Sequence, residues 1–139
     1  MSETRNTQVV KDAFAAFVRG DIAAIIDVLD DNVMWRGVIG TEGVLPQAGL
    51  RKGRAAVAQF FEQVDATLTF EQFDPREYVA QGESVVAIGR YRARTKPGGA
   101  LVDSDFVMLF TIRDGRITGF REFADSAQIV RAYSAVAVA

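Results

Sequence analysis

The chain contains no cysteine and no histidine. Without cysteine there is no disulfide, no thiol nucleophile and no thiolate metal site. The lack of histidine removes the commonest general base and the commonest metal ligand. Any acid–base chemistry must therefore come from carboxylates and tyrosines. Lysine is scarce too, so most of the positive charge is arginine, which favours fixed, bidentate pairing.

Long apolar runs and a basic excess are also missing. No apolar run approaches a membrane span, and the first residues, MSETRNTQVVKDAF, are polar. We therefore expect no signal peptide, no membrane association and a cytoplasmic location. The net charge of −2 argues against a nucleic-acid partner. With 139 residues, 49% of them hydrophobic, the chain predicts a single domain over residues 1–139 with a substantial core.

Apolar spacing predicts helices first and strands later. Helical periodicity covers residues 3–19, 21–29 and 53–68, and Asp125 is placed to cap a last helix over 126–133. A short strand is expected over 33–36, and residues 37–51 form an irregular loop that should cover something apolar. Residues 70–81 alternate as a strand, with Pro75 indicating an edge position or a bulge. Three long strands complete an α+β fold, with helices on one face of a curved sheet.

Two turn signals decide which side chains share a face of that sheet. Asp114-Gly115 is a strong two-residue hairpin signal, and the turn at 96–99 sets Arg90 opposite Asp105. Directly opposed residues share a face. A bulge would shift the parity by one residue. One face is then predicted to carry Ile88, Arg90, Arg92, Asp103, Asp105, Val107, Leu109 and Glu122, and the other Gly89, Tyr91, Phe106, Met108, Phe110, Arg121 and Phe123.

Arg90, Asp105 and Glu122 are the predicted catalytic group, because their expected neighbours are apolar and a partly buried charge needs a partner or a shifted pKa. Glu122 would be the general base, Asp105 the acid or second base, and Arg90 the orienting cation. The alternative is that the Arg90–Asp105 and Arg92–Asp103 pairs are ordinary ion pairs on a solvated sheet face. Candidate substrate-binding residues are Phe14, Phe17, Met34, Trp35, Phe60, Tyr78, Arg92, Val107, Leu109 and Phe120.

The string DGRITGFREFAD, together with the order of the elements, resembles the SnoaL-like branch of the nuclear transport factor 2-like superfamily. That superfamily includes polyketide cyclases, ketosteroid isomerases and limonene-1,2-epoxide hydrolase. The resemblance implies a cone-shaped α+β barrel: three N-terminal helices on a strongly curved, mostly antiparallel sheet, a short C-terminal helix and a conical pocket. It also implies a homodimer. The predicted face of Phe106, Met108, Phe110 and Phe123 is too apolar to leave in water, and we expect it to form the interface.

The nearest local match is to limonene-epoxide hydrolase, whose equivalent stretch reads Gly-Lys-Ile-Thr-Gly-Trp-Arg-Asp. By this resemblance the family's catalytic carboxylate falls on Glu122. The hydrolase's Arg-x-Asp pair falls on Arg90-Tyr91-Arg92, where Arg92 replaces the Asp. Its water-holding Tyr and Asn fall near Met34 and Arg36, which do not match.

Three functions remain open at this point. The first is a small cofactor-independent enzyme of isomerase, cyclase or epoxide-hydrolase type acting on a small hydrophobic substrate, with no metal. The second is a non-catalytic binder of a small hydrophobic or carboxylate ligand, which Arg90 would pair. The third is a dimeric structural module with a vestigial pocket.

Overall fold

The computed structural model describes residues 2–96 and 98–138, with side chains to residue 135. Its elements in chain order are α1 (Glu3–Val18), α2 (Ile22–Asp27), β1 (Leu29–Val38), β2 (Leu50–Lys52), α3 (Arg54–Thr67), β3 (Leu68–Gln81), β4 (Ser84–Thr95), β5 (Leu101–Arg113), β6 (Arg116–Ala124) and α4 (Ser126–Val138). No helix in this part of the chain is long and apolar enough to cross a membrane.

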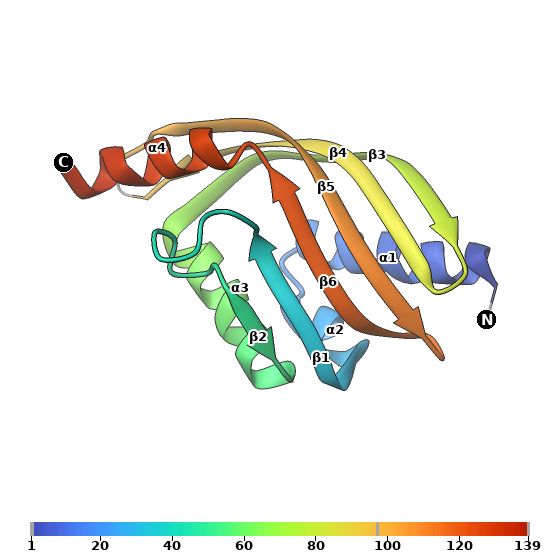
Figure 1. Ribbon diagram of the computed structural model, residues 1–139. Helices are drawn as coiled ribbons and strands as arrows, with labels where there is room; N and C mark the ends of the chain where they lie inside the picture. Colours follow the sequence, from blue (N-terminus) through green and yellow to red (C-terminus); the bar gives the residue numbers. More distant parts are fainter. Residues whose placement is uncertain (1, 97, 139) are drawn as a thin grey trace.

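The strands form one curled sheet in the order β2-β1-β6-β5-β4-β3. All neighbours are antiparallel except β1 and β6, which run parallel. The sheet curls around α1, α2 and α3 without closing, and α4 lies at one end of it (Figure 1). This is the predicted α+β cone, with its interior between the concave face of the sheet and the three helices.

Capping residues fix where the helices begin. The Ser2 side chain accepts the Arg5 amide at the start of α1, and Asp21 accepts the Ala24 amide at the start of α2. Asp125 accepts the Gln128 amide at 3.1 Å and so begins α4, as predicted. Each of these bonds satisfies an amide that the first helical turn leaves without a partner.

The region between α2 and α3 differs from the sequence-based expectation. The second helix ends at Asp27, and Leu29 already belongs to β1, which is longer than the four-residue strand expected. The polar run Asp30-Asp31-Asn32 lies within this strand, where a register shift against β6 accommodates it. The end of the predicted loop over residues 37–51 belongs to the short strand β2. Leu45 and Gln47, which precede this strand, are buried, so the loop does cover the interior.

Pro75 lies in β3, the edge strand opposite β2. The β3–β4 ladder shifts register between Pro75 and Glu77 and again between Phe70 and Gln72. Both expectations for this proline, an edge strand and a bulge, are confirmed, because only an edge or a bulge tolerates the missing amide.

The β4–β5 pairing agrees with the prediction, with Arg90 opposite Asp105. The turn that joins these strands includes Pro97, which lies outside the described residues. At the other hairpin, Asp114 and Gly115 both have positive φ angles of 52° and 77°, as the predicted two-residue turn requires.

The β5–β6 ladder contains the one departure that changes the site. It starts in the predicted register, with Arg113 opposite Arg116. Thr111 then pairs with Gly119, so Thr118 is an extra residue in β6, a β-bulge. Because side chains alternate along a strand, every later residue of β6 points to the face opposite the predicted one.

Glu122 therefore lies opposite Met108 instead of Val107, on the concave face. Arg90 and Asp105 lie on the convex face. The predicted sharing of one face by Arg90, Asp105 and Glu122 is wrong, and the bulge at Thr118 is the reason.

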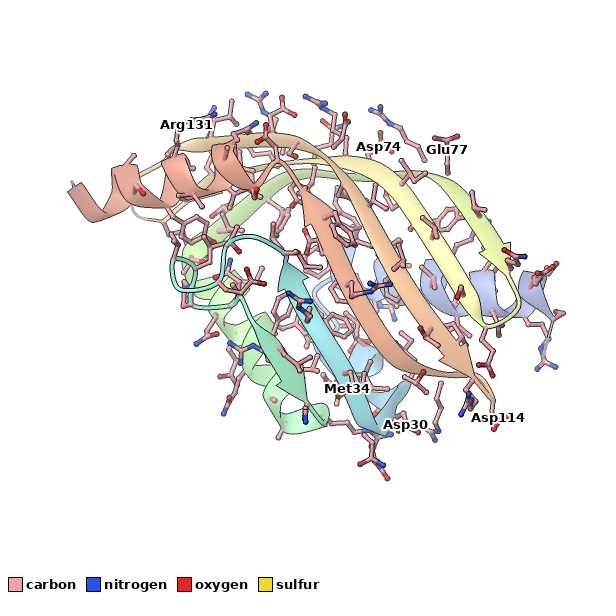
Figure 2. The ribbon with its side chains drawn as sticks, viewed as in Figure 1. Asp30, Met34, Asp74, Glu77, Asp114 and Arg131 are labelled. Atoms are coloured by element: carbon pink, nitrogen blue, oxygen red, sulfur yellow. The ribbon has the colours of Figure 1, made fainter. Side chains whose placement is uncertain are left out.

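The predicted apolar outer face is also wrong. Phe106, Met108 and Phe110 are buried on the concave side, and only Phe123 of that group is exposed, at 40%. The convex side carries charged groups, and Asp74, Glu77 and Arg131 project outward from the fold in Figure 2. A homodimer stays a prediction, but those four residues cannot form its interface together.

Candidate active site

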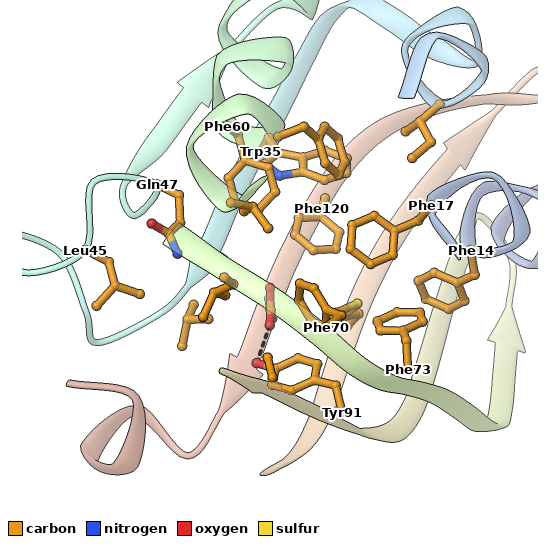
Figure 3. Close-up of a pocket in the computed structure, with 18 of the residues that line it drawn as sticks. Phe14, Phe17, Trp35, Leu45, Gln47, Phe60, Phe70, Phe73, Tyr91 and Phe120 are labelled. Carbon is orange, nitrogen blue, oxygen red and sulfur yellow. Dashed lines mark hydrogen bonds between the residues drawn. The ribbon is translucent and has the colours of Figure 1, made fainter. Parts of the chain in front are cut away.

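A cavity of about 100 Å³ lies between the concave face of the sheet and the helices. This volume exceeds what one water molecule needs several times over. Its wall is almost entirely apolar. The polar members are Gln47, Tyr91, Glu122 and Tyr133, with the indole nitrogen of Trp35. Figure 3 shows the aromatic rings of Phe14, Phe17, Trp35, Phe60, Phe70, Phe73 and Phe120 gathered along the cavity, with Tyr91 at its edge.

Glu122 is the only carboxylate on the described wall of this cavity. Its side chain comes from β6 and is 6% exposed. The Tyr91 hydroxyl, from β4, donates a hydrogen bond of 2.7 Å to Glu122 Oε2, drawn dashed in Figure 3. Phe120 points the same way two residues earlier and stacks on Trp35 at 4.0 Å between ring centroids. The bulge thus places Phe120 and Glu122 together inside the cone.

Burial raises the pKa of Glu122 from its ordinary value to about 7, and the hydrogen bond from Tyr91 opposes part of that rise. Near neutral pH both the carboxylate and the carboxylic acid are therefore populated. Burial also raises the pKa of Tyr91, and the neighbouring Glu122 raises it further. Tyr91 thus stays protonated and remains a donor while Glu122 titrates.

A second polar group lies on the same wall. Gln47 Nε2 donates to the Tyr133 hydroxyl at 2.6 Å, and the Tyr133 and Thr67 hydroxyls are 2.8 Å apart. These side chains come from the loop after β1, from α4 and from the end of α3. The pair Gln47–Tyr133 therefore ties the covering loop to the C-terminal helix.

The predicted substrate-binding residues divide into two groups. On the cavity wall lie Phe14, Phe17, Trp35, Phe60 and Phe120. Elsewhere lie Met34, Tyr78, Arg92, Val107 and Leu109. Met34 is 41% exposed on β1. Tyr78 lies outside the wall, beneath the Lys11 ammonium at 5.0 Å. Arg92, Val107 and Leu109 share the convex face with Arg90, because side chains alternate along each strand and directly paired residues point to the same face.

Arg90 and Asp105 form surface ion pairs. Arg90 contacts Asp103 at 2.8 Å and Asp105 at 3.1 Å, and the Asp105 side chain is 81% exposed. Arg92 contacts Asp103 at 3.3 Å and Glu71 at 2.9 Å. The alternative interpretation, cross-strand pairs on a solvated face, is the one that the structure supports. Neither Arg90 nor Asp105 can meet a ligand in the cavity.

Sequence reasoning missed Tyr91 and Tyr133 as site residues. Tyr91 was assigned to the outer face together with Met108 and Phe110, which also line the cavity. The sequence contained a signal for this. A sheet face that carries large apolar side chains on neighbouring strands is more consistent with a core than with a surface. Tyr133 lies at the end of the predicted last helix, and no local pattern marked it.

Within residues 2–96 and 98–138, no three His, Cys, Asp or Glu side chains gather in a way that could hold a metal ion. The polar groups on the described wall are one carboxylate, two phenols, one carboxamide and the indole N–H of Trp35, which has no hydrogen-bond partner among the described residues.

Solved structures share this fold over nearly the whole chain. A nuclear transport factor 2-like protein from Burkholderia xenovorans is 33% identical, with 96% of this chain and 98% of that one covered and a TM-score of 0.84. TerC, co-crystallised with polyporic acid, is 26% identical over 94% and 98%, with a TM-score of 0.80. A provisionally assigned polyketide cyclase from Xanthomonas campestris is 23% identical over 94% and 98%, with a TM-score of 0.75, and shows the fold alone.

No curated protein matches the chain. The model of the SnoaL-like domain family matches residues 10–120, which include β1 to β5, the bulge and Phe120. That match covers well over half of the sequence, so the chain belongs to the SnoaL-like domain family within the nuclear transport factor 2-like fold.

Proposed function

We propose that this protein is an enzyme that moves a proton within a small, largely apolar substrate, with Glu122 as the general base and acid. The observation that carries the proposal is a single carboxylate, buried in an apolar cavity, whose pKa is about 7. An acid–base catalyst works best with a pKa near the working pH, so that both protonation states are available. Proteins provisionally assigned as an isomerase and as a polyketide cyclase share this fold, and the proposed chemistry is of the same class as those assignments.

The chemistry that fits is proton abstraction from a carbon next to a carbonyl. Glu122 Oε2 is held by Tyr91, and within the described part of the chain Oε1 has no hydrogen-bond partner, so it is the oxygen left for a substrate. The carboxylate takes the proton from carbon, and the electron pair of the C–H bond moves into an enolate. In a conjugated dienolate, returning the proton from Glu122 to the far carbon gives an isomer. Alternatively, the enolate carbon attacks a second carbonyl, whose C=O π bond breaks as the ring closes, and the resulting alkoxide takes the proton back from Glu122. General base assistance of this kind contributes roughly 10²–10⁴ in rate.

Epoxide hydrolysis fits the site less well. The positions that the hydrolase uses to hold its water fall near Met34, which is exposed, and Arg36, which pairs with Glu42 at 3.0 Å on the surface. Within the described chain only Glu122 of that machinery faces the cavity. The proposal therefore stays with enolisation, isomerisation and cyclisation.

Binding without chemistry is the second candidate. An apolar cavity with a few polar groups is the usual form of a small-molecule site whether or not a reaction follows. The ligand would be neutral, because Arg90, the cation predicted to pair a carboxylate, lies on the convex face. A vestigial pocket is the weakest of the three functions, since the cavity is not filled by side chains.

Hydrogen–deuterium exchange tests the proposal without knowledge of the natural substrate. The protein would be mixed in D₂O with monocyclic and bicyclic ketones that carry acidic C–H bonds, and loss of the proton signals would be followed by NMR. We expect accelerated exchange for at least one compound, and a loss of roughly 10²–10⁴ in rate in Glu122→Gln. The matched control is Asp105→Asn, which removes an exposed carboxylate and should keep the wild-type rate.

Two results would contradict the proposal. One is a Glu122→Gln variant with the full exchange rate. The other is saturable binding of the ketones, seen as chemical-shift changes in the protein, with no acceleration for any of them. The second result would favour the binding function.

A further inference from the structure

A surface groove runs along the outer side of one part of the cavity wall. The groove, of about 730 Å³, lies between the end of α1, the helix α3 and the edge strand β3. Six apolar residues line both the groove and the cavity: Phe17, Phe61, Val64, Leu68, Phe70 and Phe73. Because the same side chains face both spaces, a single layer of side chains separates the groove from the cavity.

This shared layer is also the part of the wall that meets solvent. Most of the described wall residues are buried, and five are partly exposed: Phe17, Leu68, Phe70, Phe73 and Tyr133. The first four belong to the shared layer. The cavity therefore comes nearest to solvent along the groove.

The layer is held by contacts between rings. Phe17, in the last turn of α1, packs against Phe61 of α3 with 6.2 Å between ring centroids, and against Phe70 and Phe73 of β3 at 5.3 and 5.1 Å. Within the described chain, no hydrogen bond joins this last turn of α1 to α3 or β3. A partly exposed side chain changes rotamer in picoseconds to nanoseconds, and the groove offers space for the ring. Phe17 can therefore open the layer while the backbone stays in place.

The other end of the cavity is closed in a different way. Figure 3 shows Phe17 at one end of the cavity and Leu45 and Gln47 at the other. There Tyr133, the fifth partly exposed residue, accepts a 2.6 Å hydrogen bond from Gln47, and its hydroxyl lies 2.8 Å from that of Thr67. Opening this end would break hydrogen bonds in addition to apolar contacts, so the layer around Phe17 opens more readily.

We propose that ligands reach the cavity through the groove and that the Phe17 ring is the gate through which they pass. Resting on the proposed function, which makes the cavity the ligand site, this route would serve a binding protein as well. A molecule wider than the gap left by one ring must also displace Phe61 or Phe70. Phe17 therefore limits the size of the molecules that enter.

Trp35 can report on this route. It is the only tryptophan in the chain, it is 3% exposed, and it lies on the cavity wall behind Phe61, with 5.7 Å between the two ring centroids. Acrylamide, a small neutral quencher of tryptophan fluorescence, must enter the cavity to reach it. The quenching rate constant, from fluorescence lifetimes of the full chain at increasing acrylamide concentration, therefore measures access to the cavity.

Phe17→Ala removes the gate. We expect it to raise the quenching rate constant by about tenfold, because each aromatic contact that no longer has to break corresponds to a factor of about two to ten. Leu45→Ala is the matched control, since it removes a large apolar side chain from the wall at the opposite end. Leu45 is more deeply buried than Phe17, so its loss should loosen the packing at least as much. The rate constant should nevertheless rise by less than about twofold, below the range of one aromatic contact.

Ala58→Phe tests the route in the opposite direction. Ala58 lies on α3 and lines the groove but not the cavity. The added ring fills the groove outside the gate and should lower the quenching rate constant by about twofold or more. Should Phe17→Ala fail to fold, judged by circular dichroism, Ala58→Phe and Leu45→Ala carry the test.

Three results would overturn the route. Equal increases in Phe17→Ala and Leu45→Ala would show general loosening of the fold, and a larger increase in Leu45→Ala would place the entrance at the covering loop. The third is an Ala58→Phe variant that is quenched as fast as the wild type. None of these measurements involves Glu122, so they leave the ketone exchange experiment unaffected. Loss of ketone exchange would in turn overturn the proposed function and leave the route standing.

Discussion

The Tyr91 hydroxyl donates a 2.7 Å hydrogen bond to Glu122 Oε2 across the concave face, with β5 between the two strands that carry them. The bond has two opposite effects on the site. It lowers the pKa of Glu122, against the larger rise that burial causes. It also ties up one carboxylate oxygen and so directs the other toward the remaining space.

Stability should depend on pH through Glu122. Its pKa is raised in the folded state to about 7 from its ordinary value of 4.5, so the folded protein binds a proton that the unfolded chain has released between those values. The contribution of Glu122 to stability is therefore complete below about pH 4.5 and is lost as the pH rises to about 7. The shift corresponds to about 3 kcal/mol.

Glu122→Gln isolates this contribution, because glutamine does not titrate. Urea unfolding at several pH values should show the variant gaining on the wild type from about pH 4.5 upward, and the difference should level off above about pH 7. A stability difference between the two proteins that does not change with pH would contradict a buried, titrating Glu122. The surface carboxylates titrate equally in both proteins and cancel.

Tyr91→Phe should raise the pKa of Glu122 above its wild-type value of about 7, because the hydrogen bond that stabilises the carboxylate is lost while the burial remains. The pH midpoint of the Glu122 side-chain carbon signal, followed by NMR on protein labelled at glutamate, measures this directly. Tyr78→Phe is the matched control, since Tyr78 lies outside the cavity wall and should leave the midpoint unchanged. A midpoint that falls in Tyr91→Phe would contradict the assigned bond.

Much of the architecture could be predicted because it follows from local chemistry. The caps at Asp21 and Asp125 mark helix starts, and the Asp114-Gly115 turn fixes the first pairs of its hairpin. The Arg90–Asp105 register was correct for the same reason. In each case a few adjacent residues determine the geometry, and the sequence displays them directly.

The face of Glu122 could not be predicted in this way, because it depends on a single extra residue. Thr118 carries no mark of a bulge, and an unbroken ladder is the simpler assumption. Apolar burial alone does not select the bulge either, because it places Phe120 and Glu122 in the interior and leaves Arg121 and Phe123 outside, so that one phenylalanine takes the place of another.

The convex-face arginine should matter little to the chemistry. Arg90 bridges Asp103 and Asp105 on the outer face, where solvent screens the charges. We expect Arg90→Ala to change the ketone exchange rate by less than about twofold and to leave the Glu122 titration in place. The ketone exchange rates of the wild type, Arg90→Ala and Glu122→Gln, measured under the same conditions, test this. A tenfold loss in Arg90→Ala would show that this side of the sheet reaches the reacting groups after all.

The close packing of β3 on β4 gives a prediction about the fold itself. Gly89 occupies a position of β4 that faces the concave side of the sheet. A Cβ atom there would meet the tip of the Phe106 ring at 2.7 Å and the Pro75 Cα at 2.7 Å, and it would also contact the Asp74 carbonyl oxygen. Two of these three neighbours are backbone atoms of the bulged edge strand and cannot turn aside. Gly89→Ala should therefore destabilise the protein by about 1–3 kcal/mol, the usual range for an overpacked core.

Gly119→Ala is the matched control, because it places the same methyl group in a strand of the same sheet. There the nearest atoms belong to the Thr111 side chain at 3.4 Å, which is close to ordinary contact. Gly119→Ala should lower the free energy of unfolding by less than about 1 kcal/mol, in the range of a tolerated substitution. Urea unfolding of the two variants and the wild type measures both values. If Gly119→Ala destabilised the protein more than Gly89→Ala, the close approach of the β3 backbone to Gly89 would not be the tighter of the two contacts.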